Sequence, residues 1–216
     1  MKLRSLASVF VVWQDGSASW KFPGKYRASE VWRHIRQKQE NVPWHKLVWS
    51  SINVPKHAFV SWMAILNRLP TRDRLRDWGI EMEGKCELCH EVLETRNHLF
   101  FGCQFSKKVW EEVLKMRGIN RRVLSWEREL EWAEKRLKGR ALISVLLRAA
   151  WTVHIYHIWR ERNNRIFAQK EETWEQVVKH IKQDIRILLE RMKNVQEDHV
   201  NMLLYRRWNL SDKIFK

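Results

Sequence analysis

Four side chains with the types and spacing of zinc ligands lie within one short stretch, CELCHEVLETRNHLFFGC, which runs from Cys86 to Cys103. Two residues separate Cys86 from Cys89, and four separate His98 from Cys103. Zinc prefers thiolate and imidazole ligands in a tetrahedron, and these spacings are typical of zinc modules. Because four protein ligands leave no open position, the pattern predicts one structural zinc ion held by Cys86, Cys89, His98 and Cys103.

The same stretch allows other interpretations. CELCH is also a C-x-x-C-H haem-attachment pattern with His90 as axial ligand, but it leaves His98 and Cys103 without a role. His90 could instead replace His98 at zinc, although its place next to Cys89 would strain the turn. A site that has lost its metal is a third alternative. We favour structural zinc.

Local signals predict the elements that position these ligands. Gly84 loosens the approach to the first cysteine pair, and Thr95 can cap a short helix that carries His98 inward. Ser106 can cap the helix that follows Cys103. Upstream, Thr71 predicts the start of a short helix that Gly79 ends.

The remaining pattern is helical. Pro55 predicts a helix start, followed by an apolar face at Phe59, Trp62, Met63 and Leu66. Residues 141–167 form a helix that is apolar on two faces and is expected to be buried between others. His154, His157 and Glu161 share one side of it and could be a second metal site, but we favour core histidines.

The last predicted helix begins with a capping box at Thr173 and Gln176. A heptad seam follows, formed by Trp174, Val178, Ile181, Ile185, Leu188, Met192 and Val195. The seam suits either packing within the chain or a homodimer through this C-terminal helix. We favour packing within the chain, because the preceding apolar helix offers a partner.

The chain is strongly basic, with a net charge of +16, which is expected of a protein that meets phosphates. Residues 77–98, around the cysteines, instead carry a balance of −4. We therefore expect the flanking helices to make phosphate contacts; their alternative role is a solvated charged face. The predicted nucleic-acid-binding residues are Arg68, Arg72, Arg74, Arg76, Lys179, Lys182, Arg186 and Lys193.

Fourteen tryptophans are far more than common usage. We expect most of them in the core, with stacking on single-stranded bases as the alternative. No apolar run is long enough to span a membrane, so no membrane partner is expected. The apolar run after Lys2 and Arg4 is too short to favour a signal peptide. An odd cysteine count with metal-like spacing favours an intracellular location, nuclear or cytoplasmic.

A longer pattern resembles a known family. The run from Val42 to Trp110 is similar to the reverse transcriptase zinc-binding domain of plant LINE-type, non-LTR retrotransposons. The upstream residues that match are Trp44, Trp49, Pro55, Lys56, Phe59, Trp62, Leu69, Pro70, Thr71, Arg74, Leu75 and Gly79. In the metal-binding half they are Cys86, Cys89, Glu94, Thr95, His98, Leu99, Phe100, Cys103 and Trp110. GKYRASEVWRHIR and HIWRERNNRIF resemble the family's opening and trailing segments.

The resemblance implies an accessory zinc module that accompanies a reverse transcriptase and binds RNA or DNA weakly. We expect no enzyme, because the chain lacks the acidic catalytic sets of reverse transcriptase, RNase H and endonuclease. The alternatives are a helical protein-interaction module and a transposon relic without selected function.

The predicted fold is mainly α, with a short N-terminal strand or hairpin around Ser8 to Trp13 and a structural CCHC zinc module. Ser29 is expected to cap the first helix. The predicted organisation is an N-terminal strand and turn segment at 1–28, the zinc-binding domain at 29–118 and a C-terminal helical region at 119–216.

Overall fold

The computed structural model describes residues 11–14, 17–20, 42–137, 139, 141–192, 194–208 and 215, and the chain divides into units at 1–41 and 42–216. The first unit contains strands β1 (Val11–Gln14) and β2 (Ser17–Trp20), which pair antiparallel with Val11 opposite Trp20. β1 overlaps the strand predicted from sequence. The helix predicted at Ser29 lies outside the described residues.

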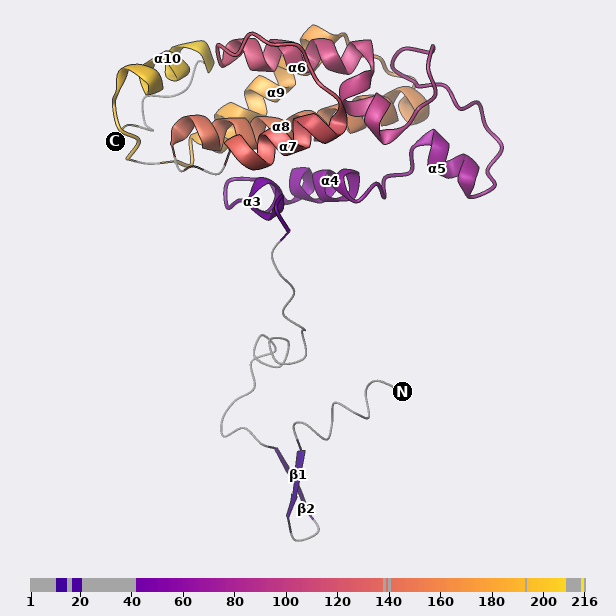
Figure 1. Ribbon diagram of the computed structural model, residues 1–216, viewed down its shortest axis with the longest axis vertical. Coiled ribbons are helices and arrows are strands. Elements are labelled where there is room, and N and C mark those ends of the chain that lie inside the picture. Colours follow the sequence, from indigo (N-terminus) through magenta and orange to yellow (C-terminus); the bar gives the residue numbers. More distant parts are fainter. Residues whose placement is uncertain are drawn as a thin grey trace. The chain divides into compact units, whose positions relative to one another are not determined.

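The second unit is built from helices (Figure 1). They are α3 (His45–Val48), α4 (Pro55–Ile65), α5 (Arg72–Asp77), the π-helix η1 (His98–Gly102), α6 (Gln104–Met116), α7 (Trp126–Arg136), α8 (Leu142–Asn163), the π-helix η2 (Asn164–Ala168), α9 (Trp174–Leu189) and α10 (His199–Trp208). The mainly α fold class is confirmed. None of the helices that the structure describes is long and apolar enough to cross a lipid bilayer.

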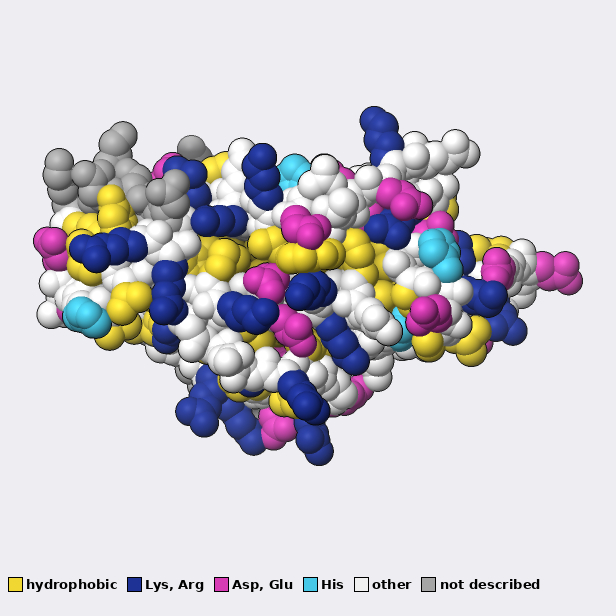
Figure 2. All heavy atoms as spheres, turned by 90° about the horizontal axis from the view of Figure 1, so that it is seen from above, with side chains coloured by type: hydrophobic (Ala, Val, Ile, Leu, Met, Phe, Trp, Pro, Cys, Tyr) yellow, Lys and Arg dark blue, Asp and Glu magenta, His cyan; other side chains and the backbone are white. Residues whose placement is uncertain are grey.

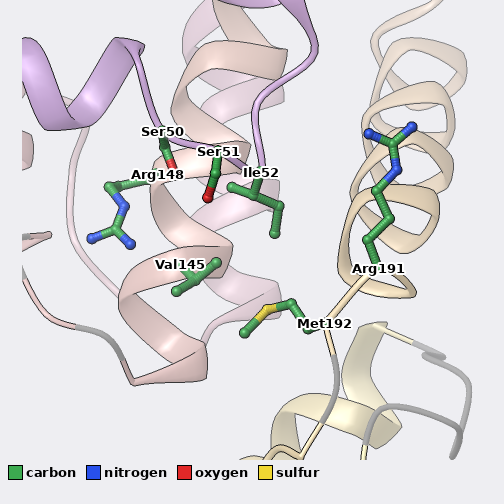
Figure 3. A pocket seen from close by; sticks show the side chains of 7 residues that line it. All are labelled: Ser50, Ser51, Ile52, Val145, Arg148, Arg191 and Met192. Carbon is green, nitrogen blue, oxygen red and sulfur yellow. The ribbon is translucent and has the colours of Figure 1, made fainter.

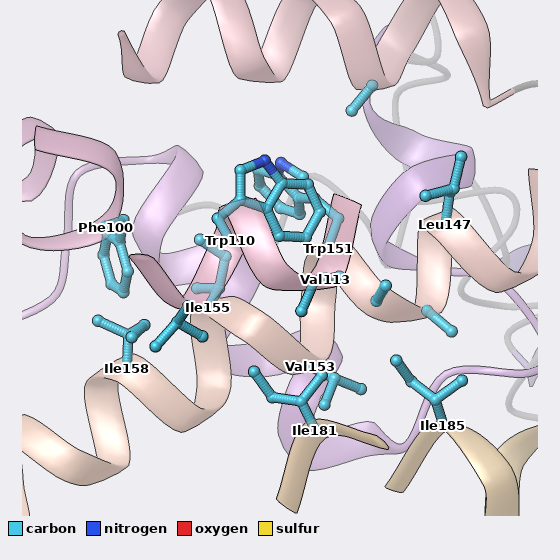
Figure 4. Close-up of a cluster of buried hydrophobic side chains, with 14 of the residues drawn as sticks. Phe100, Trp110, Val113, Leu147, Trp151, Val153, Ile155, Ile158, Ile181 and Ile185 are labelled. Carbon is cyan, nitrogen blue, oxygen red and sulfur yellow. The ribbon is translucent and has the colours of Figure 1, made fainter. Parts of the chain in front are cut away.

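Helix α8 is the centre of this unit, as its two apolar faces predict. It contacts α3, α4, α6, α7, α9, α10 and both π-helices. Apolar side chains from α6, α8 and α9 face one another between the helices (Figure 4), and Trp110, Trp151 and Ile181 are completely buried there. Burial on this scale supplies the main favourable term of folding. α8 therefore holds the second unit together.

Helix α4 packs mainly through small side chains, together with His57, rather than through its large apolar ones. Its buried residues are His57, Ala58, Ser61 and Ala64, and the Ser61 hydroxyl donates a 3.5 Å hydrogen bond to the backbone oxygen of Thr152 in α8. Of the apolar face predicted for this helix, Phe59 and Leu66 are exposed. The small residues bring α4 close to α8, so the larger side chains on the other side remain outside.

The heptad seam of α9 is used within the chain. Thr173 and Gln176 form the predicted capping box, and Ile181, Ile185 and Leu188 are buried against the core. The helix ends at Leu189, so Met192 and Val195 lie beyond it, although both are packed against the core. A homodimer through this helix would have to use a face other than the buried seam. The oligomeric state stays a prediction.

One hydrophobic core continues through the second unit. Its buried members run from Leu47 to Trp208 and lie on both sides of the boundary predicted at residue 118. The loop that carries the first cysteine pair extends from the end of the helical layers next to α5 (Figure 1). The core thus supports this loop from one side.

Candidate metal centre

The four predicted ligands come together in the structure. The ligand atoms of Cys86, Cys89, His98 and Cys103 all lie within 4.8 Å of one another. Sγ of Cys89 is 3.3 Å from Nε2 of His98. Cys86 and Cys103 are completely buried, whereas Cys89 and His98 are partly exposed. This Cys3His group could hold a metal ion, and it is the one such group among the residues that the structure describes.

A tight loop presents the first two sulfurs. Lys85 and Leu93 form an isolated antiparallel bridge, and the amide of Cys86 donates to the backbone oxygen of Val92 at 2.7 Å. The amide of His90 then donates to the oxygen of Cys86 at 2.8 Å and closes the turn. These bonds fix the loop on both sides of the cysteine pair.

His90 occupies the turn position rather than the centre. Its φ is +58°, in the left-handed region that ends such turns, and its side chain is exposed. The ligand group does not include it. The structure therefore leaves both His90 interpretations, axial haem ligand and alternative zinc ligand, without support.

The other two ligands lie at the two ends of η1. The Thr95 hydroxyl accepts a 3.1 Å hydrogen bond from the amide of His98, which confirms the predicted cap. The amide of Cys103 donates to the oxygen of His98 at 2.6 Å. A Cβ at Gly102 would lie 3.4 Å from Nδ1 of His98 and 3.2 Å from the oxygen of Asn97, so glycine suits this close approach.

Cys103 also begins the next helix. It is the N-cap residue of α6, and its oxygen accepts from the amide of Lys107 at 2.9 Å. Ser106, predicted as the cap, lies inside α6 instead, where its buried hydroxyl donates to the oxygen of Leu99 at 2.5 Å. The predicted helix start was three residues too late, because the N-cap residue is Cys103, a residue type that the usual capping preferences do not include and that makes no side-chain cap hydrogen bond here.

The sulfurs interact strongly with one another. A hydrogen bond with Cys103, together with burial, raises the pKa of Cys86 to about 12. The same hydrogen bond lowers the pKa of Cys103, and a hydrogen bond with Cys86 raises the pKa of His98. Three thiolates this close together would repel one another, so full deprotonation needs a cation among them.

The comparison with known proteins agrees with this geometry. Residues 26–110 match the family model described as zinc-binding in reverse transcriptase. The matched segment contains all four members of the Cys3His group and covers less than half of the 216 residues. No curated protein and no solved structure matches the chain.

A buried ion pair joins the matched segment to α8. The Glu94 carboxylate, which is fully buried, accepts a 2.8 Å hydrogen bond from Nη2 of Arg162 and a 3.0 Å bond from the amide of Arg72. Glu94 and the segment that contains Arg162 are both part of the family resemblance, but their pairing was not predicted from the sequence. The presence of Arg162 in a largely apolar helix could have predicted a buried ion pair, because a buried charge needs a partner.

The basic residues predicted near α5 have different surroundings. Arg72 forms an ion pair with Glu87 and donates to the oxygen of Lys85 at 2.5 Å. The Arg74 guanidinium lies over the ring of Trp78, 5.1 Å from its centre. Arg72 therefore supports the loop and Arg74 packs on the end of α5, while Arg68 and Arg76 are exposed.

The second predicted basic group lies on α9. Lys179 is exposed, Lys182 and Arg186 are half-buried, and Lys193 lies outside the described residues. On the face drawn in Figure 2, Lys and Arg side chains are spread between acidic and apolar ones. The described residues among those predicted to contact phosphate therefore lie on two separate elements, α5 with its flanking turns and α9.

The alternative metal site on α8 is not assembled. Nε2 of His154 lies 3.1 Å from the oxygen of Phe100, and Nε2 of His157 lies 2.9 Å from the Asp184 carboxylate. Glu161 accepts from Nε of Arg165 at 2.7 Å. Each of the three side chains has its own protein partner, which agrees with the favoured interpretation of core histidines.

A pocket of about 310 Å³ lies between the α3–α4 turn, α8 and the end of α9 (Figure 3). Figure 3 shows the side chains of Arg148 and Arg191 on its opposite sides. Nη1 of Arg148 donates to the backbone oxygens of Leu137 and Gly139. This guanidinium satisfies carbonyls after α7, so its position is explained by the fold.

Proposed function

We propose that the chain is a non-catalytic accessory module built around one structural zinc ion. The Cys3His group carries this proposal: three thiolates and one imidazole are a ligand set that suits zinc, and the matched family is zinc-binding. Four ligands fill the tetrahedron, so no position is left for a substrate or a reactive water. The ion would supply folding energy, about 10–16 kcal/mol in small zinc modules.

The position of the ligands defines what the ion would do. Cys86 and Cys89 lie in the loop beside α5, whereas Cys103 begins α6. A metal bound to all four would fasten this loop to the helical core. We therefore propose that the ion organises the fold and that any binding partner contacts the surrounding surface.

The metal content of purified protein tests the zinc proposal, with a matched pair of histidine variants. We expect one zinc per chain in the wild type and in His90→Ala, because His90 is exposed and outside the group. His98→Ala and Cys103→Ser should lose zinc. A covalent haem absorbance, or zinc retained in His98→Ala and lost in His90→Ala, would refute the ligand assignment.

We further propose that the module binds RNA or DNA weakly and without strong sequence preference, as a partner of a reverse transcriptase of the plant LINE type. The net charge of +16 and the exposed Arg68, Arg76 and Lys179 support this proposal. Affinity for an oligonucleotide should fall steeply as salt rises, because counterions are released on binding. Affinity that does not depend on salt would contradict phosphate contact.

A further inference from the structure

The outer face of α4 and the turn before it carry three neighbouring aromatic side chains, Trp49, Phe59 and Trp62, which we call the aromatic strip. Phe59 is 53% exposed and Trp49 is 46% exposed, while Trp62 is half-buried between them. The ring of Trp62 lies 5.8 Å from that of Phe59 and 6.3 Å from that of Trp49. The strip is one continuous aromatic surface.

The exposure of the strip is unusual for this fold. Trp110, Trp126, Trp151 and Trp208 are almost completely buried, so the core accommodates large rings well. In α4 the small residues Ala58, Ser61 and Ala64 face the core instead. Exposed apolar clusters of this kind mark interaction sites, because leaving them in water forgoes the free energy of burial.

The segment that carries the strip is basic, and its charge indicates what the strip contacts. Residues 42–69 contain Lys46, Lys56 and Arg68 and no Asp or Glu. All three cationic side chains are exposed, and Nζ of Lys56 lies 4.9 Å from the ring of Tyr156. A second copy of this chain, with a charge of +16, would be repelled from this face. The complementary partner is a polyanion that also offers flat apolar surfaces.

We infer that the aromatic strip is a stacking platform for the unpaired bases of single-stranded nucleic acid, with Lys46, Lys56 and Arg68 facing its phosphates. Aromatic side chains stack on bases without regard to sequence, because every base has a π-face. Duplexes hide those faces, so the platform favours single strands. The inference rests on the proposed nucleic-acid binding and assigns it a place on the molecule.

The test compares the full chain with two sets of variants in fluorescence anisotropy. The probes are a labelled oligothymidylate of about 16 nucleotides and an abasic strand of the same length. The double variant Trp49→Ala/Phe59→Ala removes exposed rings, and Phe167→Ala is the matched control, because Phe167 is 79% exposed and lies in η2.

We expect the double variant to bind the oligothymidylate about tenfold more weakly than the wild type. Phe167→Ala should bind like the wild type, and the abasic strand should bind equally weakly to all three proteins. Salt-dependent binding that is equal in wild type and double variant would overturn the platform but leave the proposed nucleic-acid binding intact. Absence of binding by the wild type would overturn both.

Light scattering on the same proteins tests the competing occupant. If the wild type is a dimer that the double variant splits, while affinity for the oligothymidylate is unchanged, the strip is a contact between copies of the chain and the inference is wrong. A wild type and a double variant of equal mass, together with the loss of affinity, support the platform.

Discussion

The predicted metal ligands can be recognised from the sequence, whereas not all of the residues that support them can. Cys86, Cys89, His98 and Cys103 follow from their spacing, because zinc modules use short intervals between paired ligands. The partnership of Glu94 with Arg162 does not, because the two residues lie 68 positions apart along the chain. Only the packing of the loop against α8 brings these two charges together.

Removing one member of this buried pair should be costly. Glu94→Gln leaves the Arg162 guanidinium, which is 2% exposed, without its counter-charge. We expect the free energy of unfolding to fall by roughly 3–5 kcal/mol, which is typical when one partner of a buried pair is removed. Urea unfolding measures the change.

Glu131→Gln is the matched control, because Glu131 pairs with Lys135 at 2.5 Å on the surface of α7, where its side chain is 56% exposed. Its stability should stay close to that of the wild type. A Glu94→Gln protein as stable as the control would contradict a structural role for the pair.

Buried histidines make stability depend on pH. Burial lowers the pKa of His57 to about 4, below the ordinary value of 6.5. The unfolded chain therefore binds more protons than the folded one between these values, so stability is complete above about pH 6.5 and falls as the pH drops towards 4. Burial also lowers the pKa of His154, to about 3, and adds to the same trend.

Urea unfolding as a function of pH checks this effect. His57→Gln should reduce the slope of stability against pH between 6.5 and 4 by up to about 1.4 kcal/mol per pH unit, the contribution of one proton. Acid also releases metal, but both proteins share that effect, so the difference in slope reports His57. Equal slopes would show that His57 does not titrate as its burial requires.

Helices were predictable from sequence where the residues of the helix itself contain the pattern or cap that indicates it. The two apolar faces of α8 and the capping box of α9 are local patterns, and the structure contains both elements. The orientation of α4 depended on its partner, because close packing of Ala58, Ser61 and Ala64 on α8 outweighs burial of its larger side chains. The start of α6 was missed, because its N-cap residue, Cys103, is not a residue type that usually begins a helix.

Metal removal should loosen one part of the chain more than the rest. Among the described residues, the loop from Gly84 to Glu94 contains one isolated bridge and few backbone hydrogen bonds. Its ion pairs, Glu87 with Arg72 and Glu94 with Arg162, fasten it to α5 and α8, whereas α8 and α9 are held mainly by the core. A chelator should therefore speed amide hydrogen exchange in this loop, in η1 and in the first turn of α6. Exchange in the middle of α8 should change little.

Hydrogen exchange followed by mass spectrometry, with and without chelator, measures both regions. Loss of protection throughout α8 would mean that the ion supports the whole helical unit. Unchanged protection in the loop would mean that no metal organises it.

The molecule as a whole combines a basic body with an acidic loop. The net charge was predictable from composition, and so was the balance of −4 in residues 77–98. The single core from Leu47 to Trp208 was harder to foresee, because it depends on contacts between residues far apart in the chain. Together these features separate two regions: the loop and η1 bring together the Cys3His group that could hold a metal ion, and the surrounding helices present the charged and aromatic surface.

X-ray absorption at the zinc edge of the purified chain tests the central claim most directly. Cys86, Cys89, His98 and Cys103 as ligands predict three sulfurs at about 2.3 Å and one nitrogen at about 2.0 Å, with no oxygen in the coordination sphere. Fewer than three sulfurs, a bound oxygen, or a folded protein without zinc would contradict a closed structural site.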